Sequence, residues 1–216
     1  MADVKFCGLT RADDARAGAA LGASYLGVIF AGGPRRLEPA AARAVLDGAV
    51  GAGAPRRVGV FGTQTAAEIA AIAEEVTLDV VQLHGASDVT LVRELRSWFG
   101  GEIWRVLRVR ADAAEGVWRE AAEDVDAVLV DALVDGAQGG TGVAVDWARL
   151  ADSLARGGRP RRLVLAGGLR AENLAEAIGL VGPDVVDVSS GVESATGIKD
   201  HGLMRAFAAA AVRGGR

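Results

Sequence analysis

Along this chain a short apolar run, a glycine or polar turn and an alanine-rich amphipathic run recur eight times. The apolar runs are rich in Val, Ile and Leu, which is typical of parallel strands covered on both faces. They predict strands at residues 4–6, 25–30, 57–61, 80–83, 103–109, 127–130, 163–166 and 185–188. Eight such units predict an α/β protein, a single-domain (β/α)8 TIM barrel of eight parallel strands over residues 1–216. An open doubly wound sheet is the alternative, because alternation by itself does not show that the sheet closes.

The amphipathic runs between these strands predict helices, and several of them carry recognisable ends. Residues that favour a helix N-terminus stand at five expected starts, namely Thr10 with Asp13 and Asp14, Pro39, Thr65 with Glu68, Ser87 with Asp88, and Asp146. Glycines stand where helices are expected to stop, at Gly22, Gly100 and Gly101, Gly157 and Gly158, and Gly182. No linker or low-complexity tract divides the chain, which favours one domain.

Composition and charge narrow the possible partners. Lys and Arg total 24 against 28 Asp and Glu, which gives a net charge of -4 and no basic nucleic-acid surface. One cysteine excludes an intrachain disulfide, and two histidines far apart in the sequence do not predict a metal site. Neither a secretion signal nor a membrane-spanning apolar run is evident. We therefore expect a cytoplasmic monomer or homodimer with no nucleic-acid, membrane or metal partner.

Cys7 ends the first predicted strand, within Lys5-Phe6-Cys7-Gly8-Leu9-Thr10. A free cysteine is most often a small buried side chain, but residues at the C-terminal ends of barrel strands line the active-site mouth. Lys5 lies two residues before Cys7 and therefore faces the same way. Because the eighth strand of a closed barrel lies beside the first, we predict an ion pair between Lys5 and Asp187, with Lys5 stabilising a Cys7 thiolate. A lysine that snorkels at the strand edge is the alternative.

Four further polar side chains lie at or beyond the C-terminal ends of the second and fourth predicted strands. Arg35 and Arg36 end a glycine-rich loop, and at a barrel mouth one of them would bind a carboxylate through two hydrogen bonds. Solvated arginines are the alternative. Gln82 and His84 end the fourth strand and have the same parity, so both point the same way. For His84, a hydrogen-bonded structural role competes with a substrate-binding one.

Asp131 directly follows the apolar residues 127–130. Burying an unpaired carboxylate is costly, so this position favours either a functional role or a structural cap. Partial desolvation would raise the pKa of Asp131 and suit it to donate a proton. Glycine-rich turns after the seventh and eighth strands of a barrel commonly hold a phosphate on backbone N–H groups. We expect a phosphate at Gly167, Gly168, Ser189, Ser190 and Gly191.

Together these motifs resemble the phosphoribosylanthranilate isomerase family of tryptophan biosynthesis. The motifs that carry the resemblance follow the family's order over nearly the whole chain, at residues 5–10, 58–61, 81–85, 131, 139–142, 146–147, 165–169, 187–193, 197 and 199–200. The resemblance implies an intramolecular oxidoreductase, an aldose-ketose isomerase that needs no cofactor. Its reaction would be the Amadori rearrangement of a phosphosugar, N-(5-phospho-D-ribosyl)anthranilate, to 1-(2-carboxyphenylamino)-1-deoxy-D-ribulose 5-phosphate.

The resemblance also implies residue roles. Cys7 would be the general base and Asp131 the general acid. The backbone around Gly142, Gly168, Ser190 and Gly191 would hold the phosphate, and an arginine of the loop after the second strand would hold the anthranilate carboxylate. That loop is shorter than the family pattern, so Arg35 and Arg36 both remain candidates, although counting back from Pro39 favours Arg35. Thr196 stands where the family often has proline, which bears on loop stiffness.

Three other functions compete with this interpretation. Isomerisation of the related aminoaldose of the imidazole pathway usually employs paired aspartates, and Cys7 argues against it. A thiamin-phosphate type of coupling would need a magnesium-binding carboxylate cluster, which the sequence does not contain. A non-catalytic phosphosugar-binding subunit would not require both Cys7 and Asp131.

Overall fold

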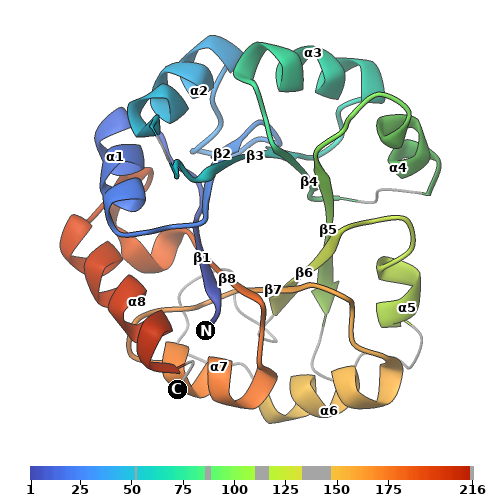
Figure 1. The fold of residues 1–216 in the computed structure, drawn as a ribbon, viewed down its shortest axis with the longest axis vertical. Helices are drawn as coiled ribbons and strands as arrows, with labels where there is room; N and C mark the ends of the chain where they lie inside the picture. Colours follow the sequence, from blue (N-terminus) through green and yellow to red (C-terminus); the bar gives the residue numbers. More distant parts are fainter. Residues whose placement is uncertain (52, 86–88, 110–116, 133–146, 215–216) are drawn as a thin grey trace.

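The protein is a closed eight-stranded barrel in its computed structural model, which describes residues 1–51, 53–85, 89–109, 117–132 and 147–214. The strands pair in chain order and β8 returns to pair with β1 (Figure 1). This confirms the (β/α)8 barrel, and the open sheet is wrong. The strands are β1 (Asp3–Phe6), β2 (Tyr25–Ile29), β3 (Arg56–Phe61), β4 (Val80–Leu83), β5 (Glu102–Val109), β6 (Ala127–Ala132), β7 (Leu163–Ala166) and β8 (Val185–Val188).

The helices form a ring outside the strands (Figure 1). They are α1 (Ala12–Ala20), α2 (Pro39–Leu46), α3 (Ala66–Val76), α4 (Val89–Arg96), α5 (Val117–Ala121), α6 (Trp147–Gly157), α7 (Leu174–Val181) and α8 (His201–Gly214), with short 3-10 helices η1 (Asp47–Ala49) and η2 (Ser190–Val192). None of the helices described is long and apolar enough to cross a membrane.

Several predicted helix ends are confirmed. Pro39 opens α2, Thr65 caps α3 in a capping box with Glu68, and Gly182 ends α7 with a φ of 59°. Thr10 does not cap α1, because its hydroxyl donates to the carbonyl of Gly197 in the loop after β8. The α4 helix ends at Arg96, ahead of the glycine pair at 100 and 101. The predictions at Ser87, Asp88 and Asp146 lie outside the described residues.

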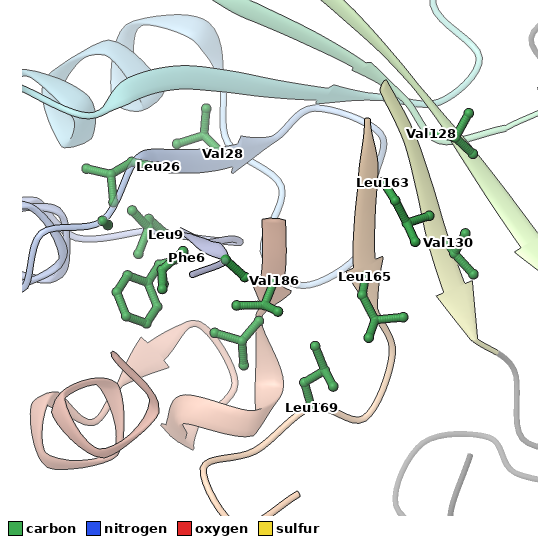
Figure 2. Close-up of a cluster of buried hydrophobic side chains, with 14 of the residues drawn as sticks. Phe6, Leu9, Leu26, Val28, Val128, Val130, Leu163, Leu165, Leu169 and Val186 are labelled. Carbon is green, nitrogen blue, oxygen red and sulfur yellow. The ribbon is translucent and has the colours of Figure 1, made fainter. Parts of the chain in front are cut away.

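Along each strand, side chains point alternately towards the helices and into the barrel interior. The candidate site is lined by side chains that point inward. Outward-facing side chains such as Phe6, Leu26 and Val186 fill the space between the strands and the helices (Figure 2). Inside the barrel, Tyr25 and Trp104 pack edge to face near the N-terminal ends of their strands, with ring centroids 4.8 Å apart. The aromatic pair fills the barrel interior at that end.

The bounds of β6 correct one prediction. Asp131 lies inside β6 and does not begin the following loop, because it pairs with Arg108 of β5 on one side and Ala166 of β7 on the other. The other predicted strand ends are either confirmed or differ by one residue. The rigid sheet therefore holds the Asp131 backbone on both sides.

A small antiparallel hairpin after β8 was not predicted. Its strands are β9 (Glu193–Ala195) and β10 (Ile198–Lys199), and their register places Glu193 opposite Lys199. Strands of three and two residues are too short to show an alternating pattern in the sequence. The hairpin brings both charged residues to the C-terminal rim of the barrel.

Candidate active site

Cys7 follows β1 directly and is buried, with 6% of the residue exposed. Its thiol lies against Gly27 of β2, where an added Cβ would stand 3.1 Å from Sγ. A side chain at position 27 would therefore displace the thiol. Glycine in the middle of this buried strand provides the space that Cys7 occupies.

Lys5 and Asp187 are opposite each other in the register of β1 and β8. Lys5 Nζ donates to Asp187 Oδ1 at 2.9 Å, and the two side chains are 0% and 8% exposed. Each charge is thus compensated by the other instead of by water. The predicted ion pair is confirmed, and the snorkelling alternative is wrong.

Burial outweighs the effect of this ion pair on the Cys7 thiol. Burial raises the pKa of Cys7 above its usual range, while the nearby Lys5 ammonium acts to lower it and the Asp187 carboxylate acts to raise it. Lys5 acts in the predicted direction, but Asp187 offsets part of its effect and burial outweighs the remainder. The net direction therefore favours the protonated thiol, while Lys5 favours the thiolate as predicted.

Arg35 reaches the end of β1 because Gly8 leaves room for it. A Cβ added to Gly8 would stand 2.8 Å from Arg35 Cδ and 2.9 Å from Ser189 Oγ. Gly8 also has a φ of 68°, a conformation that strains any other residue. The glycine after Cys7 is thus needed both for the turn and for the close approach of the arginine.

The structure separates the two candidate arginines. Arg35 donates two hydrogen bonds to Glu193, and these bonds raise the pKa of Arg35. Arg35 also lies close enough to Cys7 for the charge of Cys7 to raise the pKa of Arg35 further. Arg36 lies at the surface and pairs with the exposed Glu38 at 3.0 Å. Arg35 is therefore the arginine placed next to Cys7.

Asp131, Arg108 and His84 form a polar group on β6, β5 and the end of β4. Burial raises the pKa of Asp131, as predicted, and this effect exceeds the lowering by Arg108, whose Nε lies 3.8 Å from Asp131 Oδ2. Burial and Arg108 lower the pKa of His84. Since Arg108 Nη2 donates to His84 Nε2, the imidazole is neutral with its proton on Nδ1. The site thus holds a carboxyl group biased towards its protonated form.

Gln82 lies on β4, two residues before His84, and is 2% exposed. Its side-chain oxygen Oε1 is buried and has no hydrogen-bond partner among the residues that the structure describes. An unsatisfied buried acceptor costs about 1–3 kcal/mol. A ligand that donates a hydrogen bond would remove this cost.

The predicted phosphate loops meet after β7 and β8. Gly167 and Gly168 both have positive φ, at 92° and 63°. Gly191 approaches the first loop so closely that an added Cβ would stand 2.1 Å from the carbonyl oxygen of Leu169. Ser190 and Gly191 lie in the 3-10 helix η2, and Ser189 immediately precedes it. Gly142 lies outside the described residues.

Comparison with known proteins identifies the family of this chain. The model of the N-(5'-phosphoribosyl)anthranilate isomerase family matches residues 4–210. The enzyme of that name from Acidithiobacillus ferrooxidans is 43% identical over 213 residues, covering 97% of each chain. The chain belongs to the N-(5'-phosphoribosyl)anthranilate isomerase family.

Solved structures of phosphoribosylanthranilate isomerases agree with this assignment. The Thermotoga maritima structure superposes with a TM-score of 0.82 and 32% identity, covering 99% of this chain and 100% of that one. A structure of a phosphoribosylanthranilate isomerase in complex with reduced 1-(o-carboxyphenylamino)-1-deoxyribulose 5-phosphate superposes with a TM-score of 0.79. It is 30% identical and covers 99% of this chain and 100% of that one. The barrel described above is thus shared by members of the isomerase family.

In this isomerase family member, three charged residues at the rim were not predicted as site residues. Arg108 contacts His84 and lies near Asp131, while Glu193 contacts both Arg35 and Lys199. The sequence shows Glu193 and Lys199 on either side of Gly197, but this spacing does not predict a hairpin. Within the described part of the chain, no group of three or more His, Cys, Asp and Glu side chains is arranged to hold a metal ion.

Proposed function

We propose that this protein isomerises N-(5'-phosphoribosyl)anthranilate, with Asp131 as the general acid and Cys7 as the general base. The observation that carries the proposal is the carboxyl group of Asp131, whose pKa is raised by burial, at the same barrel rim as the sole thiol. The carboxylate of Asp187 acts to raise the pKa of both groups. An acid and a base at one rim are what an aldose-ketose isomerisation needs.

The reaction begins when Asp131 gives its proton to the furanose ring oxygen. The ring bond between that oxygen and the anomeric carbon breaks, and the nitrogen lone pair forms a Schiff base. The Cys7 thiolate then takes a proton from the neighbouring sugar carbon, and the electron pair neutralises the iminium nitrogen to leave an enolamine. The former anomeric carbon then takes up a proton, which the Cys7 thiol can return, and the enol hydroxyl on the neighbouring carbon loses its proton to the ionised Asp131, which gives the ketone and restores both residues. Only protons pass between the substrate and the protein, and the change of oxidation state is internal to the two sugar carbons, so no redox cofactor enters the balance.

Binding at both ends of the substrate would place the reacting carbons between the acid and the base. We assign the substrate carboxylate to Arg35 and the phosphate to the loops that carry Gly168 and Gly191, together with Gly142. The free acceptor of Gln82 and the neutral ring of His84 are available to substrate hydroxyl or amine groups. Binding energy from the two charged ends, remote from the chemistry, then serves to orient the sugar.

The proposal also covers the cellular compartment of the protein and its oligomeric state. We infer a cytoplasmic protein, because the single cysteine needs no oxidising compartment and the curated relatives are named as isomerases of a phosphoribosyl compound. A Thermotoga maritima relative is described as dimeric and also as generated monomers. We accordingly propose a monomer or a homodimer.

A turnover assay with two substrates tests the reaction. We expect freshly generated phosphoribosylanthranilate to be converted to its ketose, and the aminoaldose of the imidazole pathway to be converted at least about a hundredfold more slowly, because that substrate lacks the carboxylate that Arg35 would bind. Product formation is followed by chromatography. Binding of phosphoribosylanthranilate without turnover would support the non-catalytic alternative, and equal rates on both substrates would contradict the proposed specificity.

A further inference from the structure

The guanidinium of Arg35 is held along one edge only. Its Nε donates to Glu193 Oε1 at 2.7 Å and its Nη2 donates to Glu193 Oε2 at 2.6 Å. These two donors form the side edge of the guanidinium plane. The end edge, made of Nη1 and Nη2, still has donors to offer, and Nη1 has no partner among the described residues. A guanidinium can bind two carboxylates at once, one on each edge.

Glu193 is held in turn by Lys199. Lys199 Nζ donates to Glu193 Oε1 at 2.9 Å and to the Ser189 carbonyl at 3.0 Å. The Lys199 side chain is 0% exposed and that of Glu193 is 5% exposed, whereas Arg35 is 22% exposed. The register of the β9–β10 hairpin fixes the two buried residues opposite each other. The buried part of this cluster is therefore rigid, and the partly exposed part is the arginine.

Charge counting shows why the lysine matters. Arg35 with Glu193 alone would be a neutral pair, which gives little attraction to a further anion. Lys199 adds a second cation, so the three residues together carry one net positive charge next to Cys7. The Lys5 and Asp187 pair, in contrast, is neutral. The cluster of Arg35, Glu193 and Lys199 is thus the local source of uncompensated positive charge at this side of the mouth.

We propose that Glu193 and Lys199 are positioning residues that prepare Arg35 to recognise the substrate's aromatic carboxylate. Glu193 fixes the plane of the guanidinium by its side edge, which leaves the end edge for the carboxylate of the ligand. Lys199 keeps Glu193 from cancelling the charge of Arg35. This inference rests on the proposed function, in which Arg35 binds that carboxylate.

The test compares two ligands that differ only in the carboxylate. One is reduced 1-(o-carboxyphenylamino)-1-deoxyribulose 5-phosphate, and the other is the same compound with an unsubstituted phenyl ring. In Glu193→Gln, the amide nitrogen would face a guanidinium donor, so the plane of Arg35 should rotate away. We expect the carboxylate ligand to bind about tenfold more weakly and the other ligand to change less than about twofold, by calorimetry. Glu38→Gln, the exposed carboxylate beside Arg36, is the matched control and should change neither affinity.

Arg35→Ala separates this inference from the clamp on which it rests. We expect Arg35→Ala to abolish the preference for the carboxylate ligand, and Glu193→Gln to add nothing in that background. If Arg35→Ala leaves the preference intact, the clamp itself is wrong and this inference falls with it. Arg35→Ala could remove the preference while Glu193→Gln keeps it, or while Glu193→Gln lowers the affinity for both ligands equally. In either case only the positioning role is wrong. Should Glu193→Gln fail to fold, Lys199→Met must show the same selective loss, and an unselective loss there also overturns the proposal.

Discussion

Asp131→Asn is expected to lower kcat for phosphoribosylanthranilate by about 10²–10⁴, because the amide has nearly the shape of the carboxyl group but no proton to give to the ring oxygen. Binding of the reduced product analogue should change much less than turnover. Asp131 lies within β6, paired on both sides, so the backbone should stay in place. Steady-state kinetics together with calorimetric binding would show this separation.

The control for Asp131→Asn is the same exchange at a distant carboxylate. Asp13 lies on the outside of α1 and pairs with Arg16, with its side chain 70% exposed. Asp13→Asn should retain full activity. Near wild-type turnover in Asp131→Asn would rule out Asp131 as the general acid, and an equal loss of ligand binding would point to a structural role.

Cys7→Ser is expected to lower kcat by about 10²–10⁴, because a hydroxyl is far harder to ionise than a thiol and does not serve as the base. Serine is smaller than cysteine, so Gly27 continues to leave enough room and the fold should be kept. Cys7→Ala should lose as much activity as Cys7→Ser. If Cys7→Ala retained turnover, position 7 would only need a small side chain.

The same residue offers a chemical check, since Cys7 is the only thiol in the chain. Alkylation should be slow in the free protein, because Cys7 is buried and burial raises the pKa of its thiol. Loss of activity should follow modification one for one, and the reduced product analogue should slow both. Full modification with activity retained would contradict the base role.

Parity and barrel closure were enough to predict one contact between residues far apart in the chain. Lys5 faces inward because it lies two residues before Cys7, and closure puts it beside Asp187, so the pair followed from the sequence. Asp131 was predictable for a similar reason, since a carboxylate at the end of an apolar strand must be partly desolvated. Both predictions depend on regular strand geometry, which a sequence encodes directly.

Features that depend on loop conformation, or on several opposing contributions to one pKa, could not be predicted from strand geometry. The choice between Arg35 and Arg36 depends on the path of an irregular loop and on the space above Gly8. The contact between Glu193 and Lys199 depends on a hairpin too short to be recognised. The pKa of Cys7 depends on burial acting against two opposite charges, and its direction follows only once all of these are placed in space.

The raised pKa values make the proposed acid and base an unusual pair. The proposed mechanism needs Asp131 protonated and Cys7 ionised, yet burial raises the pKa of both groups, starting from ordinary values at which a carboxyl is a much stronger acid than a thiol. As the pH rises through the lower pKa, the pair loses one proton. In most molecules this proton comes from Asp131, but in a small and constant fraction of them it comes from Cys7, and these molecules are the active ones. As the pH rises through the upper pKa, the second proton leaves and the acid form is lost. Activity is thus confined between the two pKa values.

The pH dependence of kcat/KM in the wild-type protein and in Asp131→Asn tests this account most directly. For the wild type we predict a bell whose acidic limb belongs to Asp131 and whose alkaline limb belongs to Cys7. In Asp131→Asn the residual activity should lose the acidic limb and instead rise with the ionisation of Cys7 at alkaline pH. Wild-type and Asp131→Asn profiles of the same shape, differing only in height, would contradict the assignment of Asp131 and Cys7 as the acid and the base.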